Sequence, residues 1–332
     1  MKKDNNTKKV LITGGGGYIG SVVTRYLLEK GFDIRVLDLF IYGRDSLSGM
    51  LNDVEVVQGD IRDTPFVRKC LQDVDAVIHL AAIVGAPESS RIPRLTWEIN
   101  YEATKHLVNE MKKSEIPRMI FVSTCSNYGR SGDAFASEDT VLDPISPYSE
   151  SKVAAEEYIL SQKDSNFHPV ICRLATVFGV SPRMRFDLLV NQFVADAFFK
   201  KELIIFGHQG RTFVHIKDVA RVFEMLLQTN VEKISGEVFN VGSTKNSNFT
   251  KPELGQIVAG CVPGAKLTVL EKGSDLRDYK VSFDKISRVF GFRTKYSIED
   301  GVEEILEYLE KNPGLDPYSP KYSNLNKYLN LG

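Results

Sequence analysis

The chain has 332 residues, of which 42% are hydrophobic and 26% charged, and its formal net charge is −1. This length allows a large core and more than one lobe. The composition is ordinary for a soluble globular protein, and without a basic block the chain has no electrostatic footprint for nucleic acid. No apolar run reaches the ~18 residues of a membrane span. We therefore expect neither nucleic acid nor a membrane as a partner.

The four cysteines are scattered along the chain and lack the C-x-x-C spacing of a metal or redox site. They are Cys70, Cys125, Cys172 and Cys261. This pattern suits reduced thiols better than a disulfide framework or zinc. It predicts a cytoplasmic protein with no metal site.

A glycine-rich turn follows the first apolar run, residues 9–13, and leads into a helix predicted over residues 21–30. Gly14, Gly17 and Gly20 have the spacing G-x-x-G-x-x-G. Such a turn lets the backbone approach a pyrophosphate, and the helix start offers free N–H groups to it. The alternative is a flexible turn without a ligand, but the position between strand and helix favours a dinucleotide site.

The second predicted strand, residues 33–38, ends at Asp38. A carboxylate about 20 residues past the glycines holds the adenosine ribose hydroxyls in dinucleotide-binding folds. The carboxylate would repel the 2′-phosphate of NADP, so the sequence favours NAD as the cofactor. The nearby Arg44 leaves NADP as an alternative. The alternative role for Asp38 is a helix or loop cap.

The third and fourth strands, predicted over residues 54–61 and 76–82, also end in candidate cofactor contacts. Asp60 and Ile61 are candidates for contact with adenine, and Asp60 is equally a candidate cap for the next helix. The small residues that end the fourth strand would let a cofactor lie against the backbone. His79, inside this apolar strand, is interpreted as a packed core histidine rather than a base.

Further strands predicted at residues 119–124 and 168–174 alternate with helices, including one over residues 97–113. This alternation predicts an α/β fold with a doubly wound parallel sheet of the Rossmann type. After residue 174 the pattern becomes irregular and indicates a smaller C-terminal substrate-binding lobe. We expect an NAD-binding domain over 1–176, to which 215–243 returns, a substrate lobe over 177–214 and 244–315, and a loosely held tail over 316–332.

A tyrosine and a lysine lie four residues apart in a helix predicted to start near Pro147, where proline suits the first turn. Tyr148 and Lys152 then share one helix face. A nearby ammonium favours the phenolate, which brings a phenol of pKa ~10 within reach of general-base chemistry at neutral pH. The alternative is a surface pair on an amphipathic helix, which the motif alone would favour.

With the glycine turn, Asp38, Thr124, Tyr148 and Lys152 in place, the chain resembles the extended short-chain dehydrogenases/reductases, in the branch that modifies nucleotide-activated sugars. The resemblance covers about residues 9–311. The motifs that carry it lie at residues 13–20, 79–82, 123–129, 148–152, 173–179 and 211–218. Residues 174–191 most resemble sugar 4-epimerases and the GDP-heptose 4-dehydrogenase type.

The resemblance implies that Tyr148 takes the proton of a sugar hydroxyl, that Lys152 binds the nicotinamide ribose and lowers the pKa of Tyr148, and that Thr124 bonds the same sugar oxygen. It implies NAD as cofactor, held by Gly14, Gly17, Tyr18, Ile19, Gly20, Asp38, Asp60, Ile61, Leu80, Ala81, Ala82, Asn100, Tyr148 and Lys152. The implied contacts of a UDP- or GDP-linked sugar are Val84, Thr124, Thr176, Arg185, Asn191, Arg211 and Arg277. It also implies a homodimer formed by the helices at 97–113 and 148–162.

One departure from the family pattern bears on the reaction. Sugar dehydratases carry Asp and Glu directly after this threonine, whereas the chain has Cys125 and Ser126. A thiol and a hydroxyl cannot replace that acid–base pair, so dehydration is not expected. Reductive epimerases place a catalytic cysteine where Ser126 stands, so Cys125 is interpreted as a packed or substrate-near thiol.

The leading hypothesis is therefore an NAD-dependent enzyme that oxidises C4 of a nucleotide-activated sugar to a 4-keto species, as a 4-epimerase or a 4-dehydrogenase. A reductase of nucleotide-linked 4-keto sugars needs the same three residues. A non-catalytic NAD-binding scaffold is the alternative from another class, and it is disfavoured because Thr124, Tyr148 and Lys152 are all present.

Overall fold

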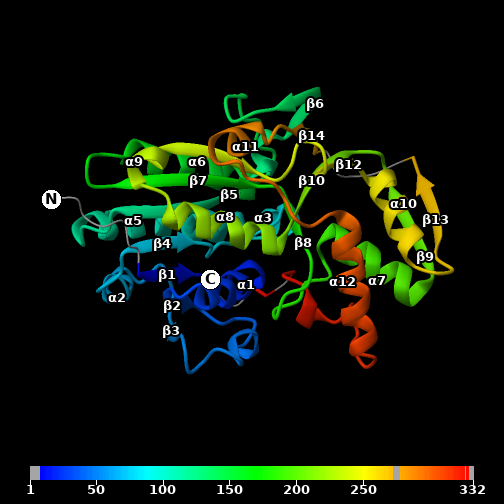
Figure 1. The fold of residues 1–332 in the computed structure, drawn as a ribbon, viewed down its shortest axis with the longest axis horizontal. Helices are drawn as coiled ribbons and strands as arrows, with labels where there is room; N and C mark the ends of the chain where they lie inside the picture. Colours follow the sequence, from blue (N-terminus) through cyan, green and yellow to red (C-terminus); the bar gives the residue numbers. More distant parts are fainter. Residues whose placement is uncertain (1–7, 272–276, 326, 329–332) are drawn as a thin grey trace.

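A computed structural model describes residues 8–271, 277–325, 327 and 328. Parts of three predicted segments lie outside the described residues. They are residues 1–7 of the NAD-binding domain, 272–276 of the substrate lobe, and 326 and 329–332 of the tail. The core of the molecule is a seven-stranded parallel sheet with the order β11-β7-β5-β4-β1-β2-β3 (Figure 1). Its strands are β1 (Lys9–Thr13), β2 (Asp33–Asp38), β3 (Glu55–Gln58), β4 (Ala76–His79), β5 (Arg118–Thr124), β7 (His168–Leu174) and β11 (Glu237–Val241). The predicted Rossmann-type sheet is confirmed.

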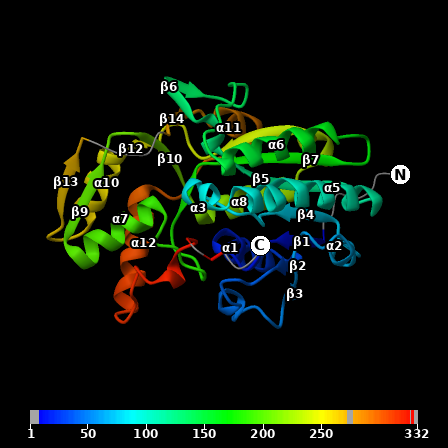
Figure 2. The same ribbon diagram turned by 180° about the vertical axis from the view of Figure 1, so that it is seen from behind.

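Helices cover both faces of this sheet, which is why the central parts of its inner strands are mostly apolar. On one face lie α1 (Tyr18–Glu29) and α8 (Ile216–Gln228), which pack against each other. On the other face lie α2 (Thr64–Cys70), α5 (Ala103–Lys113) and α6 (Pro147–Ser161) (Figure 2). Every residue of β4 and β5 is buried between these layers.

Strand order reverses between β1 and β4, because the chain runs outward from β1 through β2 to β3 and then returns to the other side of β1. Such a switch point leaves a crevice at the carboxyl ends of the strands, where open α/β sheets bind ligands. Asp38 and Thr124 both end strands at this edge. The topology therefore brings the predicted cofactor and catalytic residues together.

The helix predicted over 97–113 is divided in the structure. It comprises α4 (Pro93–Trp97), a π-helical turn (Glu98–Glu102) and α5. The remaining short helices near the sheet are α3 (Ala86–Arg91), α9 (Val231–Ile234), α11 (Asp284–Phe290) and the 3₁₀ turns Asp45–Leu47, Cys125–Tyr128 and Pro320–Tyr322. In the part of the chain that the structure describes, no helix has the length and apolar character to cross a membrane.

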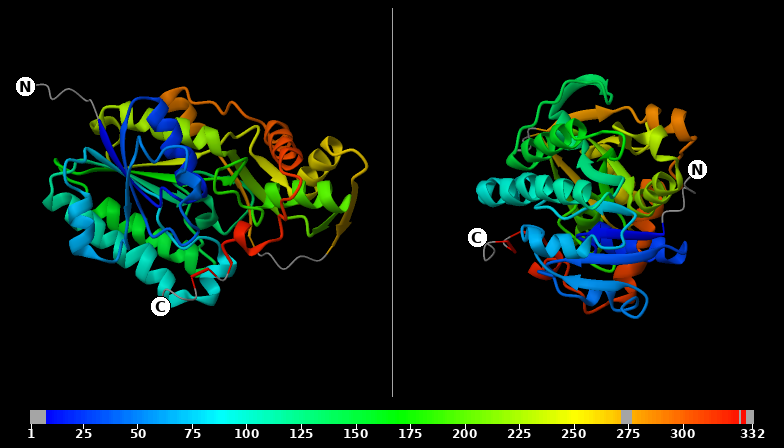
Figure 3. Two further views of the ribbon diagram at one scale, coloured as in Figure 1. Left: turned by 90° about the horizontal axis from the view of Figure 1, so that it is seen from below. Right: turned by 90° about the vertical axis from the view of Figure 1, so that its left-hand side faces the viewer.

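A smaller lobe extends from one end of the sheet domain (Figure 1, Figure 3). It contains a three-stranded sheet, β12-β10-β8, a parallel pair, β9 and β13, and the helices that pack on them. The elements are β8 (Thr176–Phe178), α7 (Leu189–Lys200), β9 (Glu202–Phe206), β10 (Gly210–His215), β12 (Asn248–Thr250), α10 (Lys251–Cys261), β13 (Lys266–Leu270) and α12 (Ile298–Lys311). A further parallel pair joins β6 (Arg130–Ala136) to β14 (Asp278–Val281).

The segment after β10 returns to the sheet domain, where β11 pairs with β7 from Glu237 to Val241. The precise domain boundaries stay a prediction. The expectation of a loosely held tail is wrong for the residues described there. Tyr328 is 6% exposed, and its hydroxyl accepts a hydrogen bond from that of Tyr42 at 2.9 Å. The backbone carbonyl of Tyr322 accepts from the amide of Phe186 at 3.0 Å, so the tail is bound to both parts of the molecule.

Candidate active site

A cavity of about 330 Å³ lies at the carboxyl ends of the strands. Most predicted site residues line it. These are Gly14, Gly17, Tyr18, Ile19, Gly20, Asp38, Asp60, Ile61, Leu80, Ala81, Ala82, Val84, Thr124, Tyr148, Lys152, Thr176, Arg185 and Arg277. The fold therefore joins three separately predicted groups, for cofactor, catalysis and substrate, in one continuous pocket.

The glycine turn brings the start of α1 against the pocket. Gly14 has φ +74°, and a Cβ there would stand 2.7 Å from the backbone nitrogen of Ala81, so only glycine fits. The α1 N-cap, Gly17, has no side chain to satisfy the first N–H groups of the helix. Open donors at a helix N-terminus suit the pyrophosphate of a dinucleotide.

Backbone hydrogen bonds hold the carboxylate of Asp38 against the same glycine turn. Its carboxylate accepts the backbone N–H groups of Gly16 at 2.9 Å and Phe40 at 2.7 Å. Burial raises the pKa of Asp38, and these hydrogen bonds oppose the rise. Arg44 donates to Gln58 at 2.6 Å and does not line the pocket. The residues present thus fit NAD, with a carboxylate rather than a free arginine where a 2′-phosphate would lie.

Asp60 lines the pocket but does not cap α2. Asp63 does so, accepting a hydrogen bond from the amide of Phe66 at 3.1 Å. The carboxylate of Asp60 instead pairs with Arg62 at 2.7 Å. Burial raises the pKa of Asp60, but the hydrogen bonds and charge of Arg62 outweigh it and the pKa is lowered. The capping alternative for Asp60 is therefore wrong.

The interpretation of His79 as a core residue is confirmed. Its ring is 1% exposed and lies within hydrogen-bond distance of the hydroxyls of Thr13, at 2.6 Å, and Thr104, at 2.9 Å. Burial and the nearby charge of Lys152 lower the pKa of His79 to about 3. The neutral imidazole is hydrogen-bonded through both ring nitrogens and so links β1, β4 and α5. We therefore interpret it as a structural residue and not as a catalytic base.

The catalytic helix begins where the sequence predicts. Ser146 caps α6 by accepting the amide of Ser149 at 3.2 Å, and Pro147 occupies the first turn. This start directs Tyr148 into the pocket, where the side chain of Thr124, at the end of β5, favours the phenolate form of Tyr148. The three predicted catalytic residues line the same cavity.

The expected lowering of the Tyr148 pKa is not found in this structure. Burial raises the pKa of Tyr148 to about 12, opposed by the hydrogen bond from Thr124 and by the charges of Arg185 and Arg277. Burial also lowers the pKa of Lys152 to about 7. The Lys152 ammonium donates to the backbone carbonyl of Val122 at 2.8 Å rather than to the phenol. Both groups are desolvated, which disfavours their charged forms.

A buried ion pair that sequence reasoning missed lies beneath Lys152. Arg173 in β7 donates to Glu156, one helical turn after Lys152, at 2.6 Å, and both side chains are less than 10% exposed. Glu156 also accepts from Ser123 and, at 2.9 Å, from Asn127. The negative charge of Glu156 favours the ammonium form of Lys152. An arginine within an apolar strand was the available signal, since a buried guanidinium needs a carboxylate partner.

The two residues after Thr124 point in different directions. Cys125 is completely buried, its thiol donates to the carbonyl of Arg173 at 3.3 Å, and burial raises its pKa. Ser126 lines the pocket, and its hydroxyl lies 3.4 Å from that of Tyr279. Of the two readings for Cys125, the packed thiol is correct. All four cysteines are free thiols.

Three predicted contacts, Asn100, Asn191 and Arg211, do not line this cavity, and their contact with a ligand stays a prediction. Asn100 clamps the backbone N–H and C=O of Ile83, at 2.8 and 2.9 Å. Asn191 accepts from the amide of Gly179 at 3.1 Å and donates to the carbonyl of Arg185 at 2.8 Å. The guanidinium of Arg211 donates to the carbonyl of Arg277. Each of these polar side chains hydrogen-bonds neighbouring backbone groups. The three residues therefore support the pocket wall without lining the cavity.

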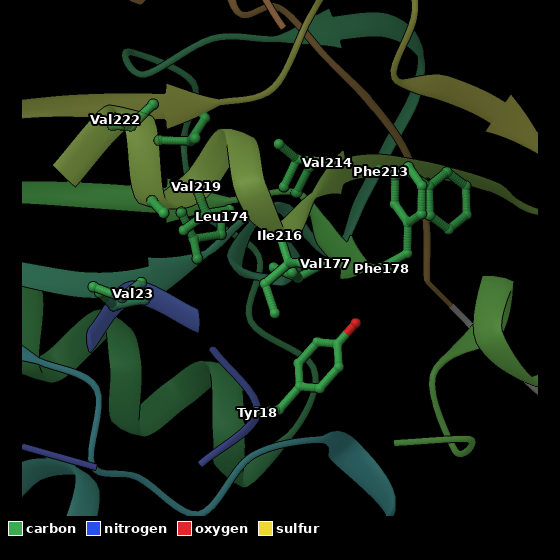
Figure 4. Packing of buried hydrophobic residues seen from close by; sticks show 14 of the residues in the cluster. Tyr18, Val23, Leu174, Val177, Phe178, Phe213, Val214, Ile216, Val219 and Val222 are labelled. Atoms are coloured by element: carbon green, nitrogen blue, oxygen red, sulfur yellow. The ribbon is translucent and has the colours of Figure 1, made fainter. Parts of the chain in front are cut away.

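Tyr18 has a double role at the lobe boundary. Its ring lines the pocket, and its hydroxyl points toward β8, as Figure 4 shows. That hydroxyl donates to the carbonyl of Gly179 at 2.6 Å and lies 3.2 Å from the amide nitrogen of Asn191. Burial raises the pKa of Tyr18, so it remains a neutral phenol. Tyr18 thus links the glycine turn to the substrate lobe.

The pocket residues that were not predicted include four with large polar side chains, Tyr42, Arg183, Asn324 and Tyr328. They come from three segments that are far apart in sequence. No short motif connects them, so no local signal pointed to them. Among the described residues, no group of three or more His, Cys, Asp or Glu side chains could hold a metal ion.

A parallel sheet with a glycine turn, an acidic strand end and a Thr–Tyr–Lys set at its switch point defines a dinucleotide-dependent oxidoreductase fold. Residues 10–242 match the model of the NAD dependent epimerase/dehydratase family. The chain belongs to this family and is an NAD-dependent enzyme of the nucleotide-sugar epimerase/dehydratase class.

Several relatives align over nearly the whole chain. The low-salt glycan biosynthesis protein Agl12 of Haloferax volcanii is 30% identical, over 90% of this chain and 97% of its own. A putative UDP-glucose 4-epimerase of Methanocaldococcus jannaschii is 28% identical, over 91% and 99%. The solved structure of DesIV, a dTDP-glucose 4,6-dehydratase from Streptomyces venezuelae, has a TM-score of 0.82 at 26% identity, over 92% and 98%. The relatives thus include both epimerases and dehydratases.

Proposed function

We propose that this enzyme oxidises C4 of a nucleotide-activated sugar to a 4-keto species, as a 4-epimerase or a 4-dehydrogenase. The observation that carries the proposal is that Thr124, Tyr148 and Lys152 line one pocket, in which the side chain of Thr124 favours the phenolate form of Tyr148. The phenolate form of Tyr148 can receive an alcohol proton and become the neutral phenol, and the neighbouring Thr124 favours that phenolate.

Each residue has a separate task in this scheme. Tyr148 removes the proton from O4, and Thr124 donates a hydrogen bond to the same oxygen as it becomes a carbonyl. NAD, when bound, takes the hydride that leaves C4. Lys152 supplies positive charge beside the phenol, since its pKa of about 7 leaves it partly protonated at neutral pH. Arg185 and Arg277 line the pocket and suit the diphosphate of the substrate.

The side chains that line the pocket disfavour the elimination of water from the sugar. Among the described pocket residues, the only carboxylates are Asp38 and Asp60, which end β2 and follow β3 at the cofactor end. The position after Thr124 holds a buried cysteine, and the next holds a serine. Elimination of water from a 4-keto sugar needs an acid and a base near C5 and C6, and neither is available here.

We expect no 4-keto-6-deoxy product from any nucleotide hexose. The purified enzyme would be incubated with UDP- and GDP-hexoses, the co-purified nucleotide would be identified by mass spectrometry, and the sugar products by mass spectrometry together with NMR, which distinguishes C4 epimers. A C4 epimer of unchanged mass supports the epimerase, and a product two hydrogens lighter supports the dehydrogenase. Accumulation of a product that has lost water would refute the assignment, as would the absence of turnover with a full panel of nucleotide sugars.

The reverse reaction, catalysed by the same residues, would reduce a 4-keto sugar. The substrate panel therefore includes NADH together with a nucleotide-linked 4-keto sugar. A non-catalytic scaffold is the weaker candidate, because such a protein has no need for the intact Thr124, Tyr148 and Lys152 set. We also propose a cytoplasmic location, which the four free thiols support.

We further propose a homodimer formed by the helices at 97–113 and α6. A partly exposed aromatic cluster on their outer side supports it. The rings of Trp97 and Tyr101 pack edge-on at 5.6 Å, and the ammonium of Lys105 lies 4.9 Å from the ring of Tyr101 and 5.8 Å from that of Tyr158. Light scattering should give twice the mass of one chain at micromolar concentration. Tyr101→Glu should shift the population to monomers, and a monomeric wild-type protein would contradict the proposal.

A further inference from the structure

We propose that Arg183 binds the diphosphate of the cofactor, and that a C-terminal strap, formed by Tyr322, Ser323, Asn324 and Tyr328, closes over the bound cofactor. The inference concerns NAD and is independent of which sugar the enzyme converts. It begins from a buried arginine that lines the pocket and is only 7% exposed.

The guanidinium of Arg183 has unused hydrogen-bonding capacity. Within the described part of the chain, its Nε and Nη1 atoms have no hydrogen-bond partner. Its Nη2 reaches only the carbonyl of Ser323, at 3.4 Å. Burying such donors without an acceptor is costly, whereas a diphosphate would accept two of them at once. The guanidinium therefore has the properties of an anion ligand.

The position of Arg183 selects the cofactor diphosphate over that of the substrate. The preceding Ser181 donates from its hydroxyl to the carbonyl of Tyr18 at 2.7 Å, and it also accepts the amide of Arg183 at 3.2 Å. This turn therefore packs on the first turn of α1, whose N-terminal N–H groups have no side-chain cap. On its other side, the guanidinium lies 3.8 Å from the ring centre of Tyr42, four residues after Asp38.

The arginines near the reacting end are different ones. Arg185 and Arg277 act electrostatically on the phenol of Tyr148, whereas Arg183 does not figure among the principal charges there. Arg185 is also held by Asp187 at 2.8 Å. Arg185 also acts electrostatically on Arg183 and Tyr42, so it lies between the two groups, whereas Arg183 lies between the start of α1 and the loop that follows β2.

The strap is anchored on both sides of the pocket. On the lobe side, Asp187 accepts the amide of Asn324 at 2.9 Å, and the ring of Tyr322 packs edge-on against that of Phe186 at 5.5 Å. On the sheet side, the hydroxyls of Tyr42 and Tyr328 share a hydrogen bond of 2.9 Å. Figure 3 shows this red segment returning from the end of α12 toward the sheet domain.

Two strap residues face the pocket directly. Asn324 and Tyr328 both line it, and the side-chain oxygen of Asn324, which is buried, has no hydrogen-bond partner among the described residues. A carbonyl oxygen there can accept from a ribose hydroxyl. The cofactor is then enclosed by the glycine turn, Arg183 and the strap, so it cannot leave until the Tyr42–Tyr328 contact opens.

The test of Arg183 uses the full-length protein stripped of nucleotide and isothermal calorimetry. Arg183→Gln should weaken NAD binding roughly 10- to 100-fold, the range for a lost hydrogen-bonded charge. Adenosine, which has no diphosphate, and UDP, which carries that of a substrate, should bind as they do to wild type. Arg94→Gln is the matched control, because Arg94 is an exposed arginine that pairs with Glu98 and does not line the pocket.

Other results would overturn the assignment of Arg183. Weaker UDP binding with normal NAD binding would move Arg183 to the substrate. Equal loss for adenosine and NAD would indicate damage to the pocket, and normal NAD affinity would remove any role in binding. If Arg183→Gln does not fold, Arg183→Lys keeps a charge without the planar stack on Tyr42 and should give a smaller loss of NAD affinity, again without loss for adenosine.

The strap is tested by the rate of cofactor release. Tyr328→Phe removes one hydroxyl and its bond to Tyr42, so NADH should dissociate about fivefold faster in a fluorescence displacement experiment. Tyr328→Ala should release it faster still. Tyr318→Phe is the control, because Tyr318 bonds Asp196 on the lobe surface. Unchanged release rates in both Tyr328 variants would show that the segment does not close over the cofactor.

Discussion

Replacement of Tyr148 by phenylalanine should lower turnover by roughly 10²–10⁴-fold, the usual contribution of a positioned acid–base group. The variant loses the hydroxyl that shares the pocket with Thr124 and Lys152, while the ring keeps its place at the start of α6. NAD binding should be nearly unchanged, because the glycine turn and Asp38 hold the cofactor at the other end of the pocket.

The measurement is steady-state turnover on the sugar identified by mass spectrometry, together with calorimetry of NAD binding. Tyr158→Phe is the matched control, since Tyr158 lies on the same helix, and its hydroxyl donates to Asn109 away from the pocket. Near-normal turnover of Tyr148→Phe would mean that another base acts, and the proposed mechanism would be wrong. Loss of NAD affinity as large as the loss of turnover would indicate a binding role instead.

Much of the sheet domain could be predicted because its signals are local. Each inner strand is a short apolar run, and Pro147 marks a helix start that the structure places at that residue. The glycine spacing and the acidic end of β2 follow from what a dinucleotide requires of the backbone. Fold, cofactor and the Thr–Tyr–Lys set were therefore accessible from the sequence.

Side-chain direction could not be predicted in the same way. Asn100, Asn191 and Arg211 stand near the pocket in sequence motifs, yet each turns to neighbouring backbone groups. Their partners are carbonyls and amides, which no sequence pattern marks. Buried polar side chains are mostly bonded to backbone, so motif position alone overstates their contact with ligand.

Long-range contacts account for the remaining differences. The strap depends on Tyr42 meeting Tyr328, 286 positions apart, and on Asp187 meeting Asn324. The pairing of β6 with β14 joins Asp278 to Arg130 and Val281 to Ala136, which are also far apart in the sequence. Irregular segments have weak periodicity, so the tail was expected to be loose, and the lobe strands were only partly predicted.

Lys152→Met should abolish most activity and yet stabilise the protein. Burial lowers the pKa of Lys152 from 10.5 to about 7, so the folded state holds its ammonium at a cost. The shift corresponds to about 5 kcal/mol at pH 7. Loss of the hydrogen bond to the Val122 carbonyl offsets part of the gain. We expect the cofactor-free variant to be about 2–4 kcal/mol more stable to urea at pH 7.

The stability difference between Lys152→Met and wild type should depend on pH in a definite direction. Between pH 7 and 10.5 the unfolded wild type binds more protons at this lysine than the folded protein does, so wild-type stability rises with pH. The advantage of Lys152→Met should therefore shrink steadily from pH 7 toward pH 10. A variant that is less stable than wild type at pH 7 would show that the ammonium is well solvated in the fold.

Activity should change in the opposite direction. Without Lys152 the pocket that holds the phenol of Tyr148, whose pKa burial raises to about 12, loses the positive charge of the lysine. Any remaining turnover should rise about tenfold for each pH unit up to pH 9, because the ionised fraction of a phenol well below its pKa rises by that factor. Turnover of Lys152→Met that equals wild type at pH 7 would contradict the role of the lysine. A stabilised but inactive variant is the outcome expected when a buried charge is retained for chemistry rather than for folding.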